Sequence, residues 1–160
     1  MSKTFCPVPW LHMATKNNGD IRICCQANLS DNQGILKNEQ GVTYNARNSN
    51  LDEAFNSPIL KEIRLNMLKG EWSTECGRCK IEEESGLPTR RLNEIDQWKE
   101  EFTYDDAVKA TASDGSVELK PIYFDLRFGN FCNLKCRMCG PTDSHSLYEE
   151  FMDYWKEGGF

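Results

Sequence analysis

The sequence lacks several features that define large classes of protein. No run of apolar residues approaches the roughly 18–20 that a membrane-spanning helix requires, so we expect no membrane span. The first residues, MSKTFCP, contain no apolar stretch of the kind found in secretory signals, which predicts a cytoplasmic protein. An excess of basic residues is also absent. The sequence has 19 Lys and Arg against 25 Asp and Glu, and the resulting net charge of −6 argues against nucleic acid as a partner.

Cysteine, by contrast, is abundant. Hydrophobic residues make up 39% of the 160 residues, enough for a packed core in one ordinary domain or two small ones. A reducing cytosol disfavours a disulfide scaffold, so these thiols are better explained as metal ligands or catalytic groups. The eight cysteines are Cys6, Cys24, Cys25, Cys76, Cys79, Cys132, Cys136 and Cys139.

Local patterns predict an α+β protein. Residues 51–69 have a helical apolar face, with Asn50 as cap, a break near Pro58 and an end at Gly70. Residues 103–119 are predicted to be a linker. We expect strands at 10–14, 21–24 and 121–128, the first two forming a hairpin, and helices at 81–86, 90–102 and 144–156, the last capped by Thr142 or Asp143.

Three cysteines follow the last predicted strand with the spacing C-x3-C-x2-C. Three thiolates on one short loop can ligate three irons of a cubane cluster, which leaves the fourth iron open to another molecule. A loop between a strand and a helix lies at the carboxyl end of a parallel sheet, where α/β folds bind ligands. The alternative is a zinc site of Cys132, Cys136 and Cys139 completed by His145.

This stretch resembles the signature of the radical S-adenosylmethionine superfamily. The resemblance implies that Cys132, Cys136 and Cys139 hold a 4Fe–4S cluster whose open iron chelates S-adenosylmethionine. One electron, from a donor such as flavodoxin or ferredoxin, then cleaves that cofactor to a 5′-deoxyadenosyl radical, which abstracts hydrogen from substrate. Met138 occupies the position where many members carry an aromatic residue packed on the adenine.

The other cysteines are dispersed over the first half of the chain. The hairpin is expected to bring Cys6 near Cys24, and a tight Cys76-Gly-Arg-Cys79 knuckle supplies two more thiols. With Pro7-Val8-Pro9-Trp10 after the first cysteine, the pattern resembles the auxiliary-cluster modules named SPASM and, in a shorter form, twitch. That resemblance implies an auxiliary 4Fe–4S cluster on these four thiolates. A zinc ribbon is the alternative, and Cys25 is either a buried apolar residue or a competitor of Cys24.

The proposed organisation has two parts. Residues 1–102 form the twitch/SPASM-like module, 103–119 the linker, and 120–160 the first strand, cluster loop and helix of a partial (β/α)6 barrel. The barrel would be incomplete, so we expect an enzyme inactive alone that needs a missing C-terminal core or second polypeptide and acts on a peptide, a protein or a small metabolite. The alternative is a non-catalytic iron–sulfur or zinc module for interaction or electron transfer.

Ordinary surface ion pairs are expected for Arg64, Arg90, Arg91 and Arg127.

Overall fold

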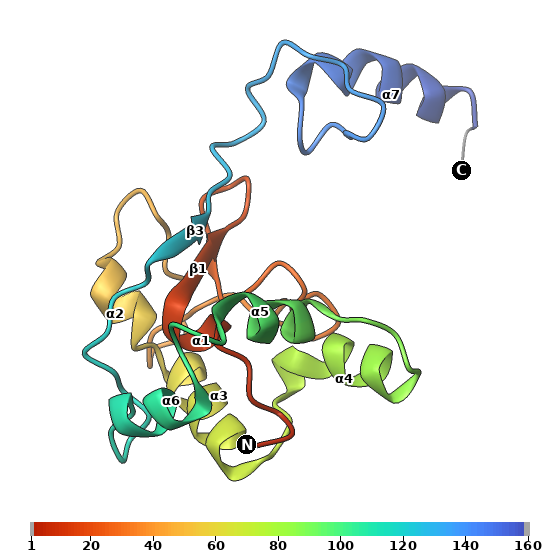
Figure 1. Ribbon diagram of the computed structural model, residues 1–160. Helices are drawn as coiled ribbons and strands as arrows, with labels where there is room; N and C mark the ends of the chain where they lie inside the picture. The colour runs from red at the N-terminus through yellow and green to blue at the C-terminus, as the bar shows by residue number, and fades with distance from the viewer. Residues whose placement is uncertain (1, 159–160) are drawn as a thin grey trace.

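The computed structural model describes residues 2–158, and its N-terminal part contains the predicted hairpin in a shortened form (Figure 1). A short helix, α1 (Val8–Leu11), precedes β1 (His12–Thr15), which pairs antiparallel with β2 (Ile21–Arg22). Trp10 and Leu11 are therefore helical, whereas the sequence predicts a strand there. The reason is local: prolines at the start of α1 have the φ angle that a first helical turn requires.

The predicted helix over 51–69 is confirmed, together with its break. It forms α2 (Leu51–Phe55) and α3 (Pro58–Lys69), because a proline is tolerated in a first turn but not inside a helix. The Asn50 side chain caps α2 by accepting from two backbone N–H groups. Gly70 ends α3 with φ of +81°, a left-handed conformation that glycine adopts without strain.

The segment between the CxxC pair and the last strand is more helical than predicted. A 3₁₀ turn, η1 (Thr74–Cys76), leads into α4 (Gly77–Glu84), so the cysteine pair begins a helix and does not form a separate knuckle. Next come α5 (Arg90–Trp98) and α6 (Tyr104–Ala110). The linker expected over 103–119 thus contains a helix, which a reciprocal capping box between Thr103 and Asp106 stabilises.

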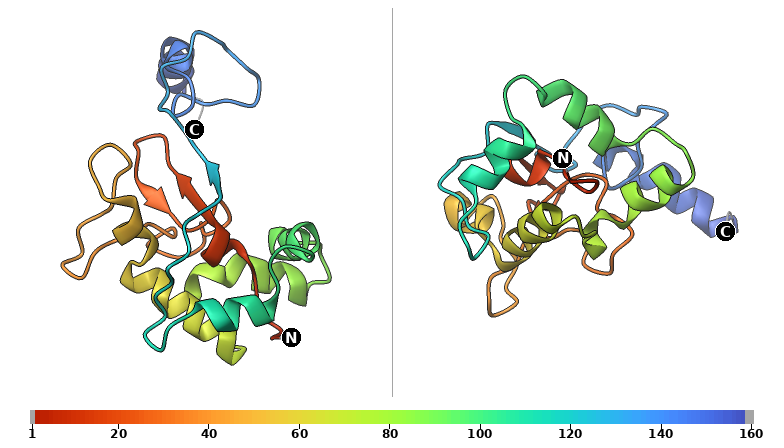
Figure 2. Two further views of the ribbon diagram at one scale, coloured as in Figure 1. Left: turned by 60° about the vertical axis from the view of Figure 1, so that its left-hand side comes forward. Right: turned by 60° about the horizontal axis from the view of Figure 1, so that its bottom comes forward.

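The C-terminal part joins the N-terminal sheet and then leaves the body. β3 (Tyr123–Asp125) pairs parallel with β1, which gives the sheet order β2-β1-β3. The chain beyond it projects away from the body and ends in η2 (His145–Leu147) and α7 (Tyr148–Lys156) (Figures 1 and 2). The sequence predicts Thr142 or Asp143 as the cap of the last helix, and this prediction is wrong. Ser144 precedes η2, and Leu147 is the residue before α7. The strand predicted to begin a barrel therefore pairs with β1 of the N-terminal part.

The core lies between the sheet and the helices and is centred on Trp10, which is fully buried. Its ring packs near those of Phe5 and Phe102, with centroids 5.8 and 6.3 Å away. Its indole N–H donates to the Thr111 hydroxyl at 2.8 Å, so burial leaves no unpaired donor there. Within residues 2–158, no helix has the length and apolar character needed to cross a membrane.

Gly115 is expected to resist substitution more than an open glycine does. Its φ is +84°, and a Cβ atom there would lie 2.4 Å from the Lys61 carbonyl oxygen. Gly115→Ala should therefore lower the free energy of unfolding by about 2 kcal/mol or more, the left-handed conformation alone costing roughly 1–2 kcal/mol. Gly86→Ala is the matched control, since Gly86 has a φ of +75° and no atom within 4 Å of its Cβ position. Equal losses in urea unfolding would contradict this account.

Candidate metal centres

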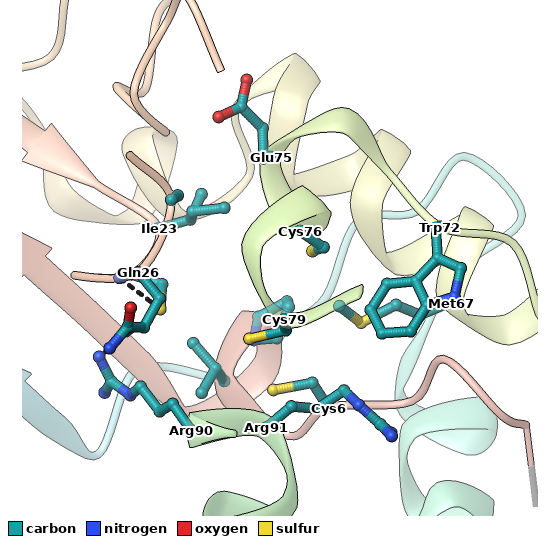
Figure 3. A pocket seen from close by; sticks show the side chains of 14 residues that line it. Cys6, Ile23, Gln26, Met67, Trp72, Glu75, Cys76, Cys79, Arg90 and Arg91 are labelled. Carbon is teal, nitrogen blue, oxygen red and sulfur yellow. Dashed lines mark hydrogen bonds between the residues drawn. The ribbon is translucent and has the colours of Figure 1, made fainter. Parts of the chain in front are cut away.

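Four cysteines from three separate segments of the chain line one cavity (Figure 3). Cys6 precedes α1, Cys24 follows β2, and Cys76 and Cys79 lie where η1 runs into α4. The cavity they surround measures about 40 Å³, and roughly 10–15 Å³ is enough to hold one water. The fold therefore brings the dispersed cysteines together and leaves space beside their sulfur atoms.

The wall of this cavity is largely apolar and raises the pKa of the thiols in it. Its other lining side chains include Val8, Ile23, Ala27, Met67 and Trp72. Burial, followed by the neighbouring Cys79, raises the pKa of Cys76 to about 12, and burial also raises the pKa of Cys6 and of Cys79. The metal-free thiols are thus neutral near pH 7, and a bound cation would have to displace their protons.

Cys25 does not line this cavity, whereas its neighbour Cys24 does. The backbone N–H of Gln26 donates to the Cys24 sulfur at 3.3 Å. The Cys25 sulfur instead accepts from the Arg90 guanidinium at 2.8 Å. The hydrogen bond between the two thiols raises the pKa of Cys24, while that bond and the Arg90 charge lower the pKa of Cys25 to about 5. The two adjacent cysteines therefore occupy different environments.

Two kinds of metal centre can be held by thiolates, and they differ in how the sulfur atoms are arranged. Among the side chains of residues 2–158, no three of His, Cys, Asp or Glu are grouped closely enough to bind a single metal ion. Zinc binds thiolates at about 2.3 Å and so holds their sulfurs within roughly 4 Å of one another. A cubane cluster binds each thiolate to a different iron, which separates the sulfurs further. The four cysteines that line the cavity can supply one thiolate to each iron of such a cluster.

The triplet Cys132, Cys136 and Cys139 lies on the projecting C-terminal part. Its loop is fixed by the residues that follow: the Ser144 hydroxyl donates to the Leu134 carbonyl at 2.7 Å, and Ser146 donates to that of Cys132 at 2.8 Å. Desolvation, followed by the charge of the adjacent Cys136, raises the pKa of Cys139. Met138 is 97% exposed and free to pack on a bound molecule.

His145, the fourth ligand of the zinc alternative, makes other interactions. Its ring stacks on Phe131, with centroids 4.8 Å apart and planes 5° from parallel. Its Nδ1 accepts the backbone N–H of Cys132 at 3.1 Å. This side chain therefore supports the start of the cysteine loop through the loop's backbone.

Sequence patterns did not indicate the arginines that lie beside the four-cysteine cavity. Arg90 and Arg91, expected on the surface, line it from the first turn of α5, and Arg91 is 8% exposed. Arg64, also expected on the surface, is completely buried. The sequence signal for Arg90 was its spacing from Glu94, four residues on, because that spacing places an ion pair on one helix face.

Comparison with known proteins bears on the four-cysteine cavity. No curated protein and no solved structure matches the chain. One family model does match, over residues 6–80, and it describes SPASM, an iron–sulfur cluster-binding domain. The matched segment contains all four cysteines that line the cavity. The similarity therefore implies iron–sulfur binding in this part of the chain, a property typical of radical S-adenosylmethionine proteins.

Proposed function

We propose that this chain is the iron–sulfur-binding part of a radical S-adenosylmethionine enzyme. The observation that carries the proposal is the convergence of Cys6, Cys24, Cys76 and Cys79 on one cavity inside the segment that matches an iron–sulfur domain. These four thiolates would hold an auxiliary 4Fe–4S cluster, and the apolar wall would exclude water from it. Because each of the four irons would be bound by a protein thiolate, this cluster would have no open iron to bind substrate.

The triplet is assigned a different role in this proposal. Cys132, Cys136 and Cys139 would hold the second cluster, with an iron open to S-adenosylmethionine, and the bound cluster would supply the electron for cleavage of that cofactor. The exposed Met138 would pack on the adenine, as a thioether packs on an aromatic ring. The substrate of this chemistry would be a peptide, a protein or a small metabolite, and the electron would come from an external donor.

The first experiment is anaerobic reconstitution with iron and sulfide, followed by metal analysis and paramagnetic resonance. We expect about eight irons per chain and a reduced-cluster signal that changes when S-adenosylmethionine is added. One observation favours a second candidate, a non-catalytic electron-transfer or interaction module: the triplet loop is exposed, with Cys136 and Met138 open to solvent. Two clusters with no response to the cofactor would support that candidate. Zinc in place of iron would refute both cluster assignments.

Cys136→Ala is expected to separate the two centres. Removing one of three thiolates leaves the triplet unable to hold its cluster, while the buried cavity is unchanged. Iron should fall from about eight to about four per chain, and the remaining signal should ignore S-adenosylmethionine. Asn133→Ala is the control, because Asn133 is an exposed residue of the same loop without a thiol, and this variant should keep all the iron. Loss of both signals in the cysteine variant would contradict two independent sites.

A further inference from the structure

The first turn of α5 forms a wall of the four-cysteine cavity, although it lies outside residues 6–80 that match the iron–sulfur domain (Figure 3). Thr89 fixes this turn from both sides. Its side chain accepts the backbone N–H of Leu92 at 3.3 Å and donates to the Glu83 carboxylate, on α4, at 2.8 Å. The helix that follows the matched segment is therefore attached to the helix that carries Cys79.

Arg90 points its guanidinium at the cysteine pair. One terminal nitrogen donates to the Cys25 sulfur at 2.8 Å and lies 3.5 Å from that of Cys24. The Nε atom donates to Glu94 at 2.9 Å, and the other terminal nitrogen lies 3.4 Å from the Tyr123 hydroxyl. The side chain is 17% exposed and is held at three points, so its donor toward the sulfurs keeps a fixed direction.

The Arg91 side chain faces the same cavity, but its guanidinium donates to oxygen atoms. It donates to the Phe5 carbonyl oxygen, next to Cys6, at 2.8 Å and to the Glu83 carboxylate at 2.8 Å. It thereby holds the segment before α1 against α4. The two adjacent guanidinium groups differ in role. That of Arg91 positions the backbone that bears the ligands, and that of Arg90 donates hydrogen bonds to the sulfur atoms.

The charge and the hydrogen bonds of Arg90 would affect the reduction potential of a cluster held by the thiolates. A cluster bound by four thiolates carries net negative charge, which increases when it gains an electron. A positive charge beside the cluster and a hydrogen bond to a ligand sulfur, here the 3.5 Å contact with Cys24, stabilise the reduced form more than the oxidised form, and so raise the reduction potential. The Glu94 carboxylate also accepts hydrogen bonds from the Tyr123 hydroxyl at 2.6 Å and from the Trp98 indole at 3.2 Å. Its position is therefore not set by Arg90 alone.

We propose that Arg90 tunes the four-thiolate centre, and that its charge and its hydrogen bonds to the Cys24–Cys25 pair raise the reduction potential of the cluster held there. The inference rests on the proposed function, since it requires that cluster. On reduction the cluster gains one electron from an external donor. No covalent bond forms or breaks, and the guanidinium keeps its protons.

The test measures midpoint potential and uses Cys136→Ala as the parent, so that a single cluster titrates. Into it are placed Arg90→Gln, Arg90→Lys and the control Arg78→Gln. Arg78 lies between Cys76 and Cys79, but its side chain is 39% exposed and donates to Glu82 at 2.8 Å. The potential is followed by paramagnetic resonance during stepwise reduction with dithionite, and iron content is measured for every protein.

We expect Arg90→Gln to move the potential to a more negative value, with Arg78→Gln close to the parent. Arg90→Lys keeps the charge but lacks the planar donor fork, so it should shift in the same direction by less. If the parent binds no iron, the proposed function fails and the inference with it. If the parent binds iron, an unchanged potential in Arg90→Gln overturns the inference alone. Folded Arg90 variants that both fail to bind iron overturn it as well, because Arg90 would then be needed for assembly.

Discussion

Arg64→Met is expected to lower the free energy of unfolding by about 3–5 kcal/mol, because it leaves several buried acceptors without a donor. The Arg64 guanidinium is fully buried and donates to the carbonyl oxygens of Pro9, Phe55 and Gly115 at 2.9, 2.7 and 3.2 Å. It also donates to the Asn56 side chain at 3.1 Å. Burial lowers its pKa to about 9, which keeps the group charged at neutral pH.

Methionine fills much of the same volume, so the loss measures hydrogen bonding more than packing. The contacts of Arg64 join α3 to Pro9 in α1, shortly after Cys6, and to the bend at Gly115. Arg47→Met, at an exposed loop position, is the matched control and should stay within about 0.5 kcal/mol of the unchanged protein. Urea unfolding followed by circular dichroism makes the comparison. A loss below about 1 kcal/mol for Arg64→Met would refute the role of these bonds.

Cys76→Ser is expected to remove the iron of the buried cavity, about four atoms per chain, and to leave the triplet loaded. Serine replaces the thiol with a group of similar size that is a poor ligand for iron, so packing changes little. The bound centre contributes directly to folding free energy, and the variant should therefore also unfold at lower temperature than the loaded protein. In the metal-free proteins the difference should largely disappear.

Cys25→Ser is the control for this loss, because Cys25 lies beside the cavity without lining it. It should retain the full iron content. The opposite pattern, with iron lost in Cys25→Ser and kept in Cys76→Ser, would contradict the ligand set. Metal analysis of anaerobically reconstituted proteins, measured beside Cys24→Ser, also determines which of the two adjacent cysteines binds iron.

Local signals predicted the helices well where a single residue imposes the backbone. Asn50, Pro58 and Gly70 set the start, break and end of the α2–α3 pair as expected. The same kind of signal is present at Thr103, whose pairing with Asp106 begins α6 inside the predicted linker. At Trp10 the apolar pattern favoured a strand, but the prolines that precede it favour one helical turn.

The parts that could not be predicted depend on contacts between distant residues. Nothing near Tyr123 specifies that it lies beside His12, because a strand of three residues has too few side chains to define its partner. The choice between Cys24 and Cys25 at the cavity likewise depends on how the chain leaves β2. Arg90 and Arg91 are ordinary in composition, and their role appears only when α5 packs against the segments before α1 and after β2.

The central position of β1 has a consequence for how the protein is made. One edge of β1 is covered by β2, which follows at once, but the other is covered by β3, which leaves the ribosome much later. Until then β1 presents unpaired N–H and C=O groups, and such an edge pairs readily with strands of other molecules. A shortened chain ending after α6 would keep that edge uncovered permanently. Aggregation of such a fragment during expression would therefore reflect an unpaired strand and carry no information about its cysteines.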